Sequence, residues 1–304
     1  MKTMKTFPIL LLAGLLTFTA CNKEDDMPVV KEKNLVETAQ AAGQFTVLLQ
    51  AAQKAGLADF LSSENGLTVF APTDDAFAAL LTKLGLTSLD QVDNQTLAAI
   101  LKYHVVGSEV YSTSLKSGVV PSLNTGSPDK TPLSLLVNVG STVMINDAKV
   151  VKADVMASNG VIHVIDKVLL PPTVVDLATY NADFTTLVSA VVKADLASTL
   201  SGNGPFTVFA PTNSAFTNLL ASLGLSGLDA VPLPTLTGIL TYHVVGDNVR
   251  STELSNGKVN TVNGKPVEFA LGSNVTINGK VKVVVTDIQG TNGVIHVIDQ
   301  VLLP

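Results

Sequence analysis

The sequence predicts an α+β fold that occurs twice along the chain, and three observations support this prediction. A ten-residue segment that begins at Thr68 returns at Thr207, an offset of 139 in the numbering. In each copy, segments with apolar residues at helical spacing come first. Short Val- and Thr-rich runs, separated by Gly, Asn and Pro as is typical of strands, come afterwards. Helices and strands are therefore largely segregated within each copy, which characterises an α+β domain with a sheet core.

The N-terminal half of each copy is expected to be helical around one buried strand. Apolar residues at helical spacing predict three helices, and the second of these follows the strand Thr68–Phe70, which Pro72 stops. Thr73 is a suitable N-cap for that second helix, with two acidic residues in its first turn. The stripes expected to face the core are Phe45, Leu48, Leu49 and Ala52, then Phe77, Leu80, Leu81 and Leu84, repeated as Phe216, Leu219, Leu220 and Leu223, and lastly Leu97, Ile100 and Leu101.

Two further repeated segments show how the copies correspond. The segment from Tyr103 to Gly107 returns as Tyr242 to Gly246, at the same offset of 139, whereas Asn159–Asp166 returns as Asn292–Asp299, at an offset of only 133. The difference predicts a net insertion of six residues in the first copy, which we place in the turn-rich stretch 126–132. A repeat of this length indicates two domains rather than a solenoid, expected at 34–171 and 173–304 and joined by the short, stiff Pro171-Pro172-Thr173.

The N-terminus resembles a bacterial lipoprotein signal. Two lysines precede a short apolar run, which is typical of a secretory signal peptide over residues 1–20 and too short to span a bilayer. Phe18-Thr19-Ala20-Cys21 resembles a lipobox, in which Cys21 becomes the lipidated N-terminus. The acidic stretch that follows resembles the surface-export signal of Bacteroidetes lipoproteins, and residues 21–33 would form a tether. We expect an outer-membrane lipoprotein on the cell surface, with a periplasm-facing protein as the alternative.

Composition excludes several classes of function. The chain has 304 residues, a net charge of −6 and a single Arg, so nucleic acid is not an expected partner. Without residues 1–20 it has 17 basic and 25 acidic residues, a charge of −8, and attachment to a membrane would therefore depend on acyl chains. There is no Trp to offer a broad sugar-stacking surface, and one Cys allows neither an internal disulfide nor a multi-cysteine metal site. No nucleophile elbow, phosphate loop or dinucleotide motif is present.

The three repeated segments together resemble the fasciclin (FAS1) domain family. They read Thr-Val-Phe-Ala-Pro-Thr-(Asp/Asn)-x-Ala-Phe, then Tyr-His, then Asn-Gly-Val-Ile-His-Val-Ile-Asp-x-Val-Leu-Leu-Pro, in the same order in both copies. The resemblance implies a β-sandwich or wedge packed with several helices in each domain. It also implies roles in cell adhesion and contact with extracellular matrix, and it brings neither an enzyme activity nor a cofactor.

The candidate interaction residues are Tyr103 and His104, with their counterparts Tyr242 and His243. In related animal proteins this Tyr-His region is implicated in integrin binding, so the resemblance implies a contact site. The alternative is structural, because each His follows a helical stripe and could bond to a free carbonyl at the helix C-terminus. His163 and His296 alternate with Val and Ile in a strand, and are expected to be satisfied within the sheet. No metal site is expected, because three or more convergent ligands are not visible.

The sequence therefore predicts a lipid-anchored, non-catalytic envelope protein that mediates adhesion, or contact with a surface protein, matrix or glycan. Two alternatives are a glycan-capturing lipoprotein of a nutrient-uptake system and a structural accessory subunit of an envelope complex. A hydrolase is the least expected, because no nucleophile and base are paired in the motifs.

Overall fold

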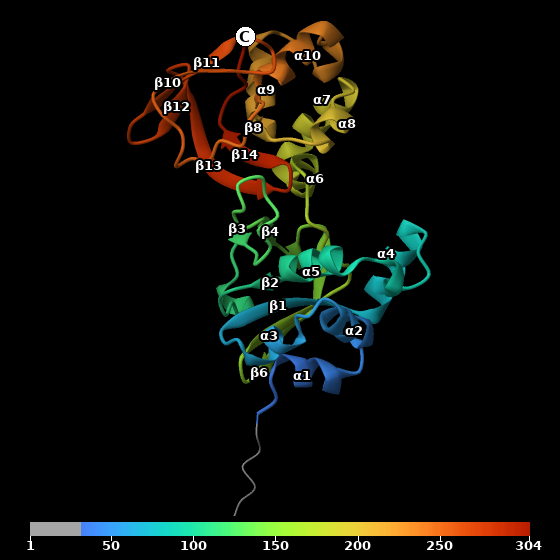
Figure 1. Ribbon diagram of the computed structural model, residues 1–304. Helices are drawn as coiled ribbons and strands as arrows, with labels where there is room; N and C mark the ends of the chain where they lie inside the picture. Colours follow the sequence, from blue (N-terminus) through green and yellow to red (C-terminus); the bar gives the residue numbers. More distant parts are fainter. Residues whose placement is uncertain (1–31) are drawn as a thin grey trace, which may run out of the picture. The chain divides into compact units, whose positions relative to one another are not determined.

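The structure is a computed structural model that describes residues 32–304. The predicted signal peptide, Cys21 and all of the tether but its last two residues lie outside the described residues. Two domains follow one another along the described chain, each with its own seven-stranded sheet and its own helices (Figure 1). No helix within residues 32–304 has both the length and the apolar character needed to cross a bilayer.

Each domain follows the same order of elements. The first domain contains α1 (Leu35–Ala42), α2 (Thr46–Lys54), α3 (Ala58–Ser63), β1 (Leu67–Pro72), α4 (Asp74–Leu84), α5 (Asn94–Tyr103), β2 (Val105–Val106), β3 (Gly118–Pro121), β4 (Ser134–Val139), β5 (Val143–Ile145), β6 (Ala148–Ala157) and β7 (Gly160–Ile165). The second contains α6 (Val174–Tyr180), α7 (Thr185–Lys193), α8 (Ala197–Ser201), β8 (Phe206–Pro211), α9 (Asn213–Ser222), α10 (Leu233–Tyr242), β9 (Val244–Val245), β10 (Gly257–Asn260), β11 (Pro266–Leu271), β12 (Val275–Ile277), β13 (Val281–Gly290) and β14 (Gly293–Ile298). Helices come early and most strands late, so the predicted α+β order is confirmed.

The seven strands of the first domain form one hydrogen-bonded sequence, β2-β1-β7-β6-β5-β4-β3. All pairs are antiparallel except β1 with β7, which run parallel in register from Leu67 opposite Gly160 to Pro72 opposite Ile165. The register of β6 against β7 shifts twice between Val150 and Val155, as expected of bulges that bend a sheet. The second domain repeats this topology as β9-β8-β14-β13-β12-β11-β10.

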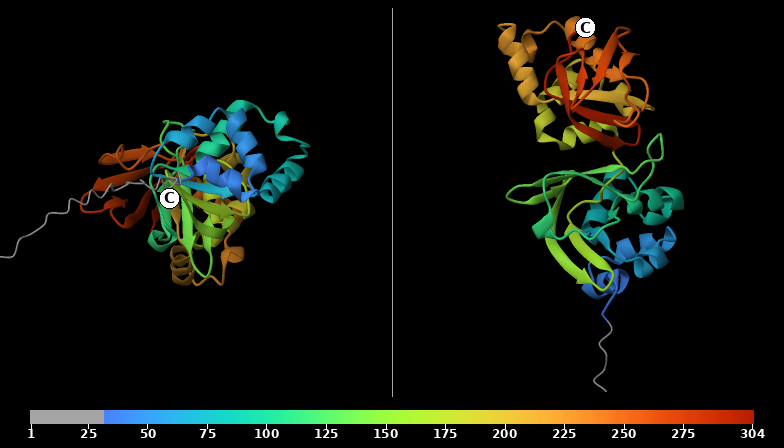
Figure 2. Two further views of the ribbon diagram at one scale, coloured as in Figure 1. Left: turned by 90° about the horizontal axis from the view of Figure 1, so that it is seen from below. Right: turned by 90° about the vertical axis from the view of Figure 1, so that its left-hand side faces the viewer.

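Because the sheet bends, each domain has two clusters of buried apolar side chains, one on each face of the central strands. One face of β1 and β7 packs under the helices, where Val69 and Ile162 lie with Phe77 and Leu97. The other face packs against the bent-over strands β4 and β5, through residues such as Phe70 and Ile165. Strand β7 is consequently buried along its whole length. The predicted wedge with packed helices is confirmed, and the right-hand view of Figure 2 shows the strands and the helices of each domain on opposite sides.

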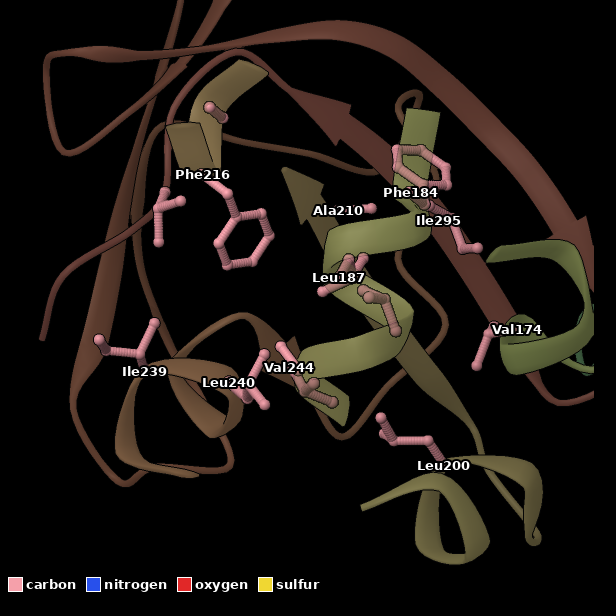
Figure 3. Close-up of a cluster of buried hydrophobic side chains, with 14 of the residues drawn as sticks. Val174, Phe184, Leu187, Leu200, Ala210, Phe216, Ile239, Leu240, Val244 and Ile295 are labelled. Carbon is pink, nitrogen blue, oxygen red and sulfur yellow. The ribbon is translucent and has the colours of Figure 1, made fainter. Parts of the chain in front are cut away.

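The second domain has equivalent clusters of its own. Figure 3 shows the helical side, where side chains from α7, α9 and α10 converge on strands β8 and β14. Phe184, Leu187, Phe216, Leu240 and Ile295 point into this cluster, and all are almost fully buried. The buried residues of each cluster come from one half of the chain only, so each domain has its own core.

Two expectations from the sequence are corrected. The apolar stripe of α4 leaves the core early: Phe77 is buried, whereas Leu84 is 52% exposed and its counterpart Leu223 is 55% exposed. The buried residues of α4, Ala76 and Phe77, lie near its start, whereas Leu84 at its end is exposed. A helical stripe therefore predicted the buried face correctly but not how far the packing continues.

The second correction concerns the insertion. The offset between corresponding strands falls from 139 at β3 and β10 to 132 at β4 and β11, so the intervening loop is seven residues longer in the first domain. The offset then rises to 133 at β6 and β13, because the turn before β13 has one residue more than the turn before β6. The net difference of six thus comes from two places, although the predicted stretch 126–132 does lie in the longer loop.

Candidate functional site

The Tyr-His segment lies at the end of α5, between the helices and the sheet. Asp93 caps the start of this helix by accepting a hydrogen bond from the backbone N–H of Thr96 (2.9 Å). Leu97 and Leu101 face the core, and the helix ends at Tyr103 with His104 as its C-cap. The segment then enters β2, which pairs with β1. This position places both side chains inside the domain: Tyr103 is 0% exposed and His104 is 1% exposed.

His104 is held by two hydrogen bonds to the backbone. Its Nδ1–H donates to the carbonyl of Ile100 (2.8 Å), and its Nε2 accepts from the N–H of Leu169 (2.9 Å). The first bond satisfies a carbonyl at the helix C-terminus, as predicted. The second attaches the segment after β7 to the helix. Burial lowers the pKa of His104 to about 4, so the ring is neutral and does not act as a cation on the helix dipole.

His243 repeats this arrangement in the second domain. Its ring bonds to the carbonyl of Ile239 (2.8 Å) and to the N–H of Leu302 (2.9 Å), and burial lowers its pKa to about 4 as well. The two histidines thus perform the same structural task in both domains.

Tyr103 ties its helix to the far part of the sheet. Its hydroxyl donates to the carbonyl of Ser134 in β4 (2.7 Å) and accepts from Nδ2 of Asn146 (2.8 Å). Asn146 has a positive φ of 54° in the turn before β6, and its Oδ1 accepts from the N–H of Leu136. Burial raises the pKa of the Tyr103 hydroxyl far above its ordinary value. The same bonds join Tyr242 to Pro266 (2.9 Å) and Asn278 (3.0 Å).

The strand histidines His163 and His296 bond to backbone groups through both ring nitrogens. Nδ1 of His163 accepts a bond from the N–H of Asp154 (3.3 Å), and its Nε2–H donates to the carbonyl of Val110 (2.8 Å). Asp154 has a positive φ of 54° at the bend of β6, and its carboxylate accepts bonds from the backbone N–H and the hydroxyl of Ser112. These bonds lower the pKa of Asp154. His163 also stacks on Phe70, with ring centroids 5.6 Å apart.

The second domain has the same group, formed by Ser251, Asp287 and His296. It contains serine, aspartate and histidine, but the order is not that of a nucleophile and its base. The serine bonds to the aspartate, and both ring nitrogens of the fully buried histidine bond to backbone groups. Asp166 is not part of this group, and its carboxylate accepts from the backbone N–H of Lys149 in β6 (2.7 Å).

Sequence reasoning did not identify the role of Asn159, the first residue of the third repeated segment. Its Oδ1 accepts from the N–H of Leu35 at the start of α1 (2.8 Å), and its Nδ2 donates to the carbonyls of Leu61 (3.0 Å) and Glu64 (2.6 Å). One side chain therefore holds α1, the end of α3 and the β6–β7 turn together. Asn292 makes the corresponding bonds. Its repetition at the same place in both copies was the available signal.

The four candidate interaction residues are thus all interior, since Tyr242 and His243 are only 4% and 2% exposed. A partner of this region would meet the neighbouring exposed residues, such as Lys102 and Glu109. Whether the region binds a partner stays a prediction. Among residues 32–304, no three His, Cys, Asp or Glu side chains come together as a metal site would require.

Comparisons with known proteins agree with the duplicated fold. A model of the fasciclin domain family matches residues 43–171 and again 182–304. Transforming growth factor-beta-induced protein ig-h3 of Sus scrofa is 31% identical over 91% of this chain, and human periostin is 31% identical over 82% of it. The matched parts amount to 40% and 29% of those two proteins, which are much longer.

A bacterial protein and a solved structure are also similar to this chain. Protein sll1483 of Synechocystis is 44% identical over 43% of this chain, and the match covers 73% of that protein. The solved FAS1 domain pair of the insect cell adhesion molecule fasciclin I matches with a TM-score of 0.51 and 21% identity, over 85% of this chain and 97% of that one, and so agrees in fold. The chain described here belongs to the fasciclin domain family, of which it carries two tandem domains.

Proposed function

We propose that this chain is a lipid-anchored protein of the bacterial cell envelope whose two fasciclin domains bind other molecules without transforming them. The observation that carries the proposal is that the side chains of the repeated motifs form hydrogen bonds inside their own domain. In both domains, the repeated Tyr, His and Asn residues are engaged in hydrogen bonds to their own domain. What each domain presents to its surroundings is therefore surface rather than reactive groups.

The relatives support adhesion as the role. The solved fasciclin I pair belongs to a cell adhesion molecule, and the fasciclin family resemblance implies contact with cells or matrix. Two similar domains on one anchor could bind a repetitive partner by avidity, even where each single contact is weak. The partner would be a surface protein, a matrix component or a glycan.

The anchor is proposed from Cys21 and the lipobox-like residues before it. Several acyl chains hold a protein firmly on a membrane, because each buried CH₂ contributes about 0.8 kcal/mol. The acidic stretch behind Cys21 supports an outward-facing position on the outer membrane.

Protease treatment of intact cells, with the wild-type chain and with Cys21→Ala, tests anchoring and sidedness together. We expect the wild-type chain to fractionate with the outer membrane and to be cut on intact cells, while a periplasmic marker stays whole. The Cys21→Ala chain should leave the membrane fraction. A wild-type chain that is soluble and unacylated would refute the anchor, and a chain protected until cells are opened would place it on the periplasmic side.

Adhesion is tested with the same cells on immobilised matrix proteins and on a glycan array. Attachment that requires the wild-type chain and disappears with Cys21→Ala supports the adhesion role. Capture of defined glycans without cell attachment would instead favour the glycan-capturing alternative, and co-purification with an envelope complex would favour the accessory subunit.

A further inference from the structure

The first domain has a surface pocket of about 360 Å³ beside the Tyr-His segment. The side chains that line it come from α3 and the residue before it, the end of α5, β2 and the loop after β3. They are Leu57, Phe60, Leu61, Leu101, Lys102, Val105 and Leu123. Six of the seven are apolar, and the seventh is a lysine. This volume lies within the range of small-molecule sites, about 300–1,000 Å³.

The walls of the pocket are held in place by the core. Leu101 and Val105 are almost fully buried, and the backbone N–H of Leu123 donates to the carbonyl of Val105 (2.8 Å). Asn124 fixes the same loop by donating from its side chain to the carbonyl of Ala99 in α5 (2.7 Å). Phe60, which is 37% exposed, forms an apolar wall that is open to a ligand.

Lys102 supplies the only charged side chain of this lining. It is exposed, and it takes part in none of the ion pairs formed within residues 32–304. An apolar surface with one free ammonium group at hand suits a ligand that is apolar over most of its length and anionic at one end.

A peptide fits this lining less well than a simple amphiphile. Every peptide unit carries a donor and an acceptor that need partners when they leave water. The lining side chains offer one polar group in all, which can serve one terminal carboxylate.

The second domain provides an internal comparison. At the positions of Phe60 and Lys102 it has Thr199 and Thr241, whereas Leu61 and Leu101 correspond to Leu200 and Leu240. The hydroxyl of Thr241 bonds to the carbonyl of Thr237 within its own helix (2.8 Å). The apolar floor is therefore retained in the second domain, while the aromatic wall and the cation are missing.

A second, smaller pocket shares part of this lining. This pocket of about 40 Å³ is lined by apolar side chains of α1, α2, β1 and β7, by His104, and by Leu61, Leu101 and Val105, which also line the larger pocket. The three shared side chains therefore each border two unfilled spaces.

We propose that this pocket of the first domain binds an aliphatic monocarboxylate, such as a medium-chain fatty acid, with its chain on Phe60, Leu61 and Leu101 and its carboxylate at Lys102. The test titrates the purified full chain with decanoate, and with decylamine as the probe of opposite charge. Calorimetry measures affinity and stoichiometry, and amide NMR shifts locate the site.

We expect one decanoate per chain, with shifts concentrated in α3 and at residues 101–105, and weaker binding of decylamine. Lys102→Thr, which introduces the residue of the second domain, should weaken decanoate about two- to fivefold, as expected for an exposed ion pair. Phe60→Thr should weaken both probes about tenfold, through loss of apolar contact. Lys83→Thr, at another exposed lysine of the same domain, should have no effect.

The reverse substitution is tested in the second domain. Thr199→Phe combined with Thr241→Lys should raise the stoichiometry from one to two. Equal binding of decanoate and decylamine, an unchanged affinity in Lys102→Thr, or shifts mapping elsewhere would each overturn the proposal. Phe60 and Lys102 are both at the surface, so we expect their variants to fold. Thermal unfolding of every variant checks this.

Discussion

Replacement of His104 by alanine should destabilise the first domain strongly, although no ligand contact is removed. The substitution takes away both hydrogen bonds of the ring, to Ile100 (2.8 Å) and to Leu169 (2.9 Å). A buried carbonyl and a buried N–H would then lack partners. Each such group costs about 1–3 kcal/mol, and the space left by the ring adds to this. We expect a loss of about 3–5 kcal/mol in the free energy of unfolding.

Differential scanning calorimetry and urea unfolding of the full chain measure this loss. In a domain of this size, 1 kcal/mol corresponds to about 3–5 °C, so the melting temperature of the first domain should fall by roughly 10–20 °C. His243→Ala should have the same effect on the second domain, since its ring makes the equivalent bonds. The double variant should show both losses, each in its own domain.

His104→Asn is the matched control, because its amide can donate to Ile100 but cannot also accept from Leu169. It should therefore recover only part of the lost stability. The reasoning would be refuted if His104→Ala unfolded at the wild-type temperature. A stable variant that had lost attachment to cells or matrix would show instead that the Tyr-His segment is a contact site.

Three further predictions concern the same framework. The free energy of unfolding of both domains should fall as the pH is lowered from about 6.5 to about 4, because the unfolded state takes up protons on His104 and His243 before the folded state does. The loss should reach about 3 kcal/mol per domain. Urea midpoints measured across this pH range would detect the loss, and a flat profile would contradict the prediction. Asn159→Ala should lower the stability of the first domain by about 2–4 kcal/mol through loss of three hydrogen bonds, one buried and two part-buried, and Asn292→Ala should do the same in the second domain. Unchanged hydrogen exchange at α1 would show that Asn159 does not hold that helix. Gly160→Ala should destabilise the first domain by several kcal/mol, because a Cβ at this position would collide with the carbonyl of Leu67. Gly227→Ala is the control: its Cβ would meet open space, so the free energy of urea unfolding should change by less than about 1 kcal/mol. Equal effects of the two substitutions would refute the close approach of β1 and β7.

Much of the fold could be predicted because it depends on local patterns that occur twice. The stripe of Leu97 and Leu101 placed a helix correctly, and the position of His104 after it correctly indicated a bond to a helix carbonyl. These signals involve residues within one or two turns of each other, where spacing along the chain determines spacing in the structure.

The bonds that join distant segments could not be predicted in the same way. Asp154 was not identified as the neighbour of His163, because the two meet through a bend in β6 and not through a regular strand register. Tyr103 and Asn146 lie far apart in the sequence, and Asn146 makes this bond from a turn in which its φ is positive. The exposure of Leu84 depends likewise on which segments pack against the end of α4, which periodicity does not report.

The coincidence of the internal bonds in the two domains has a practical consequence for engineering. Asn159 and Asn292 donate hydrogen bonds to corresponding backbone carbonyls, those of Leu61 in α3 and Leu200 in α8. The stretch 57–61 can therefore be exchanged with 196–200 while these hydrogen bonds are kept. Such a chimera would move outer-surface character from one half to the other and leave the scaffold intact. Duplication has thus produced two domains with the same internal hydrogen bonds, and the exposed residues of each domain are free to diverge.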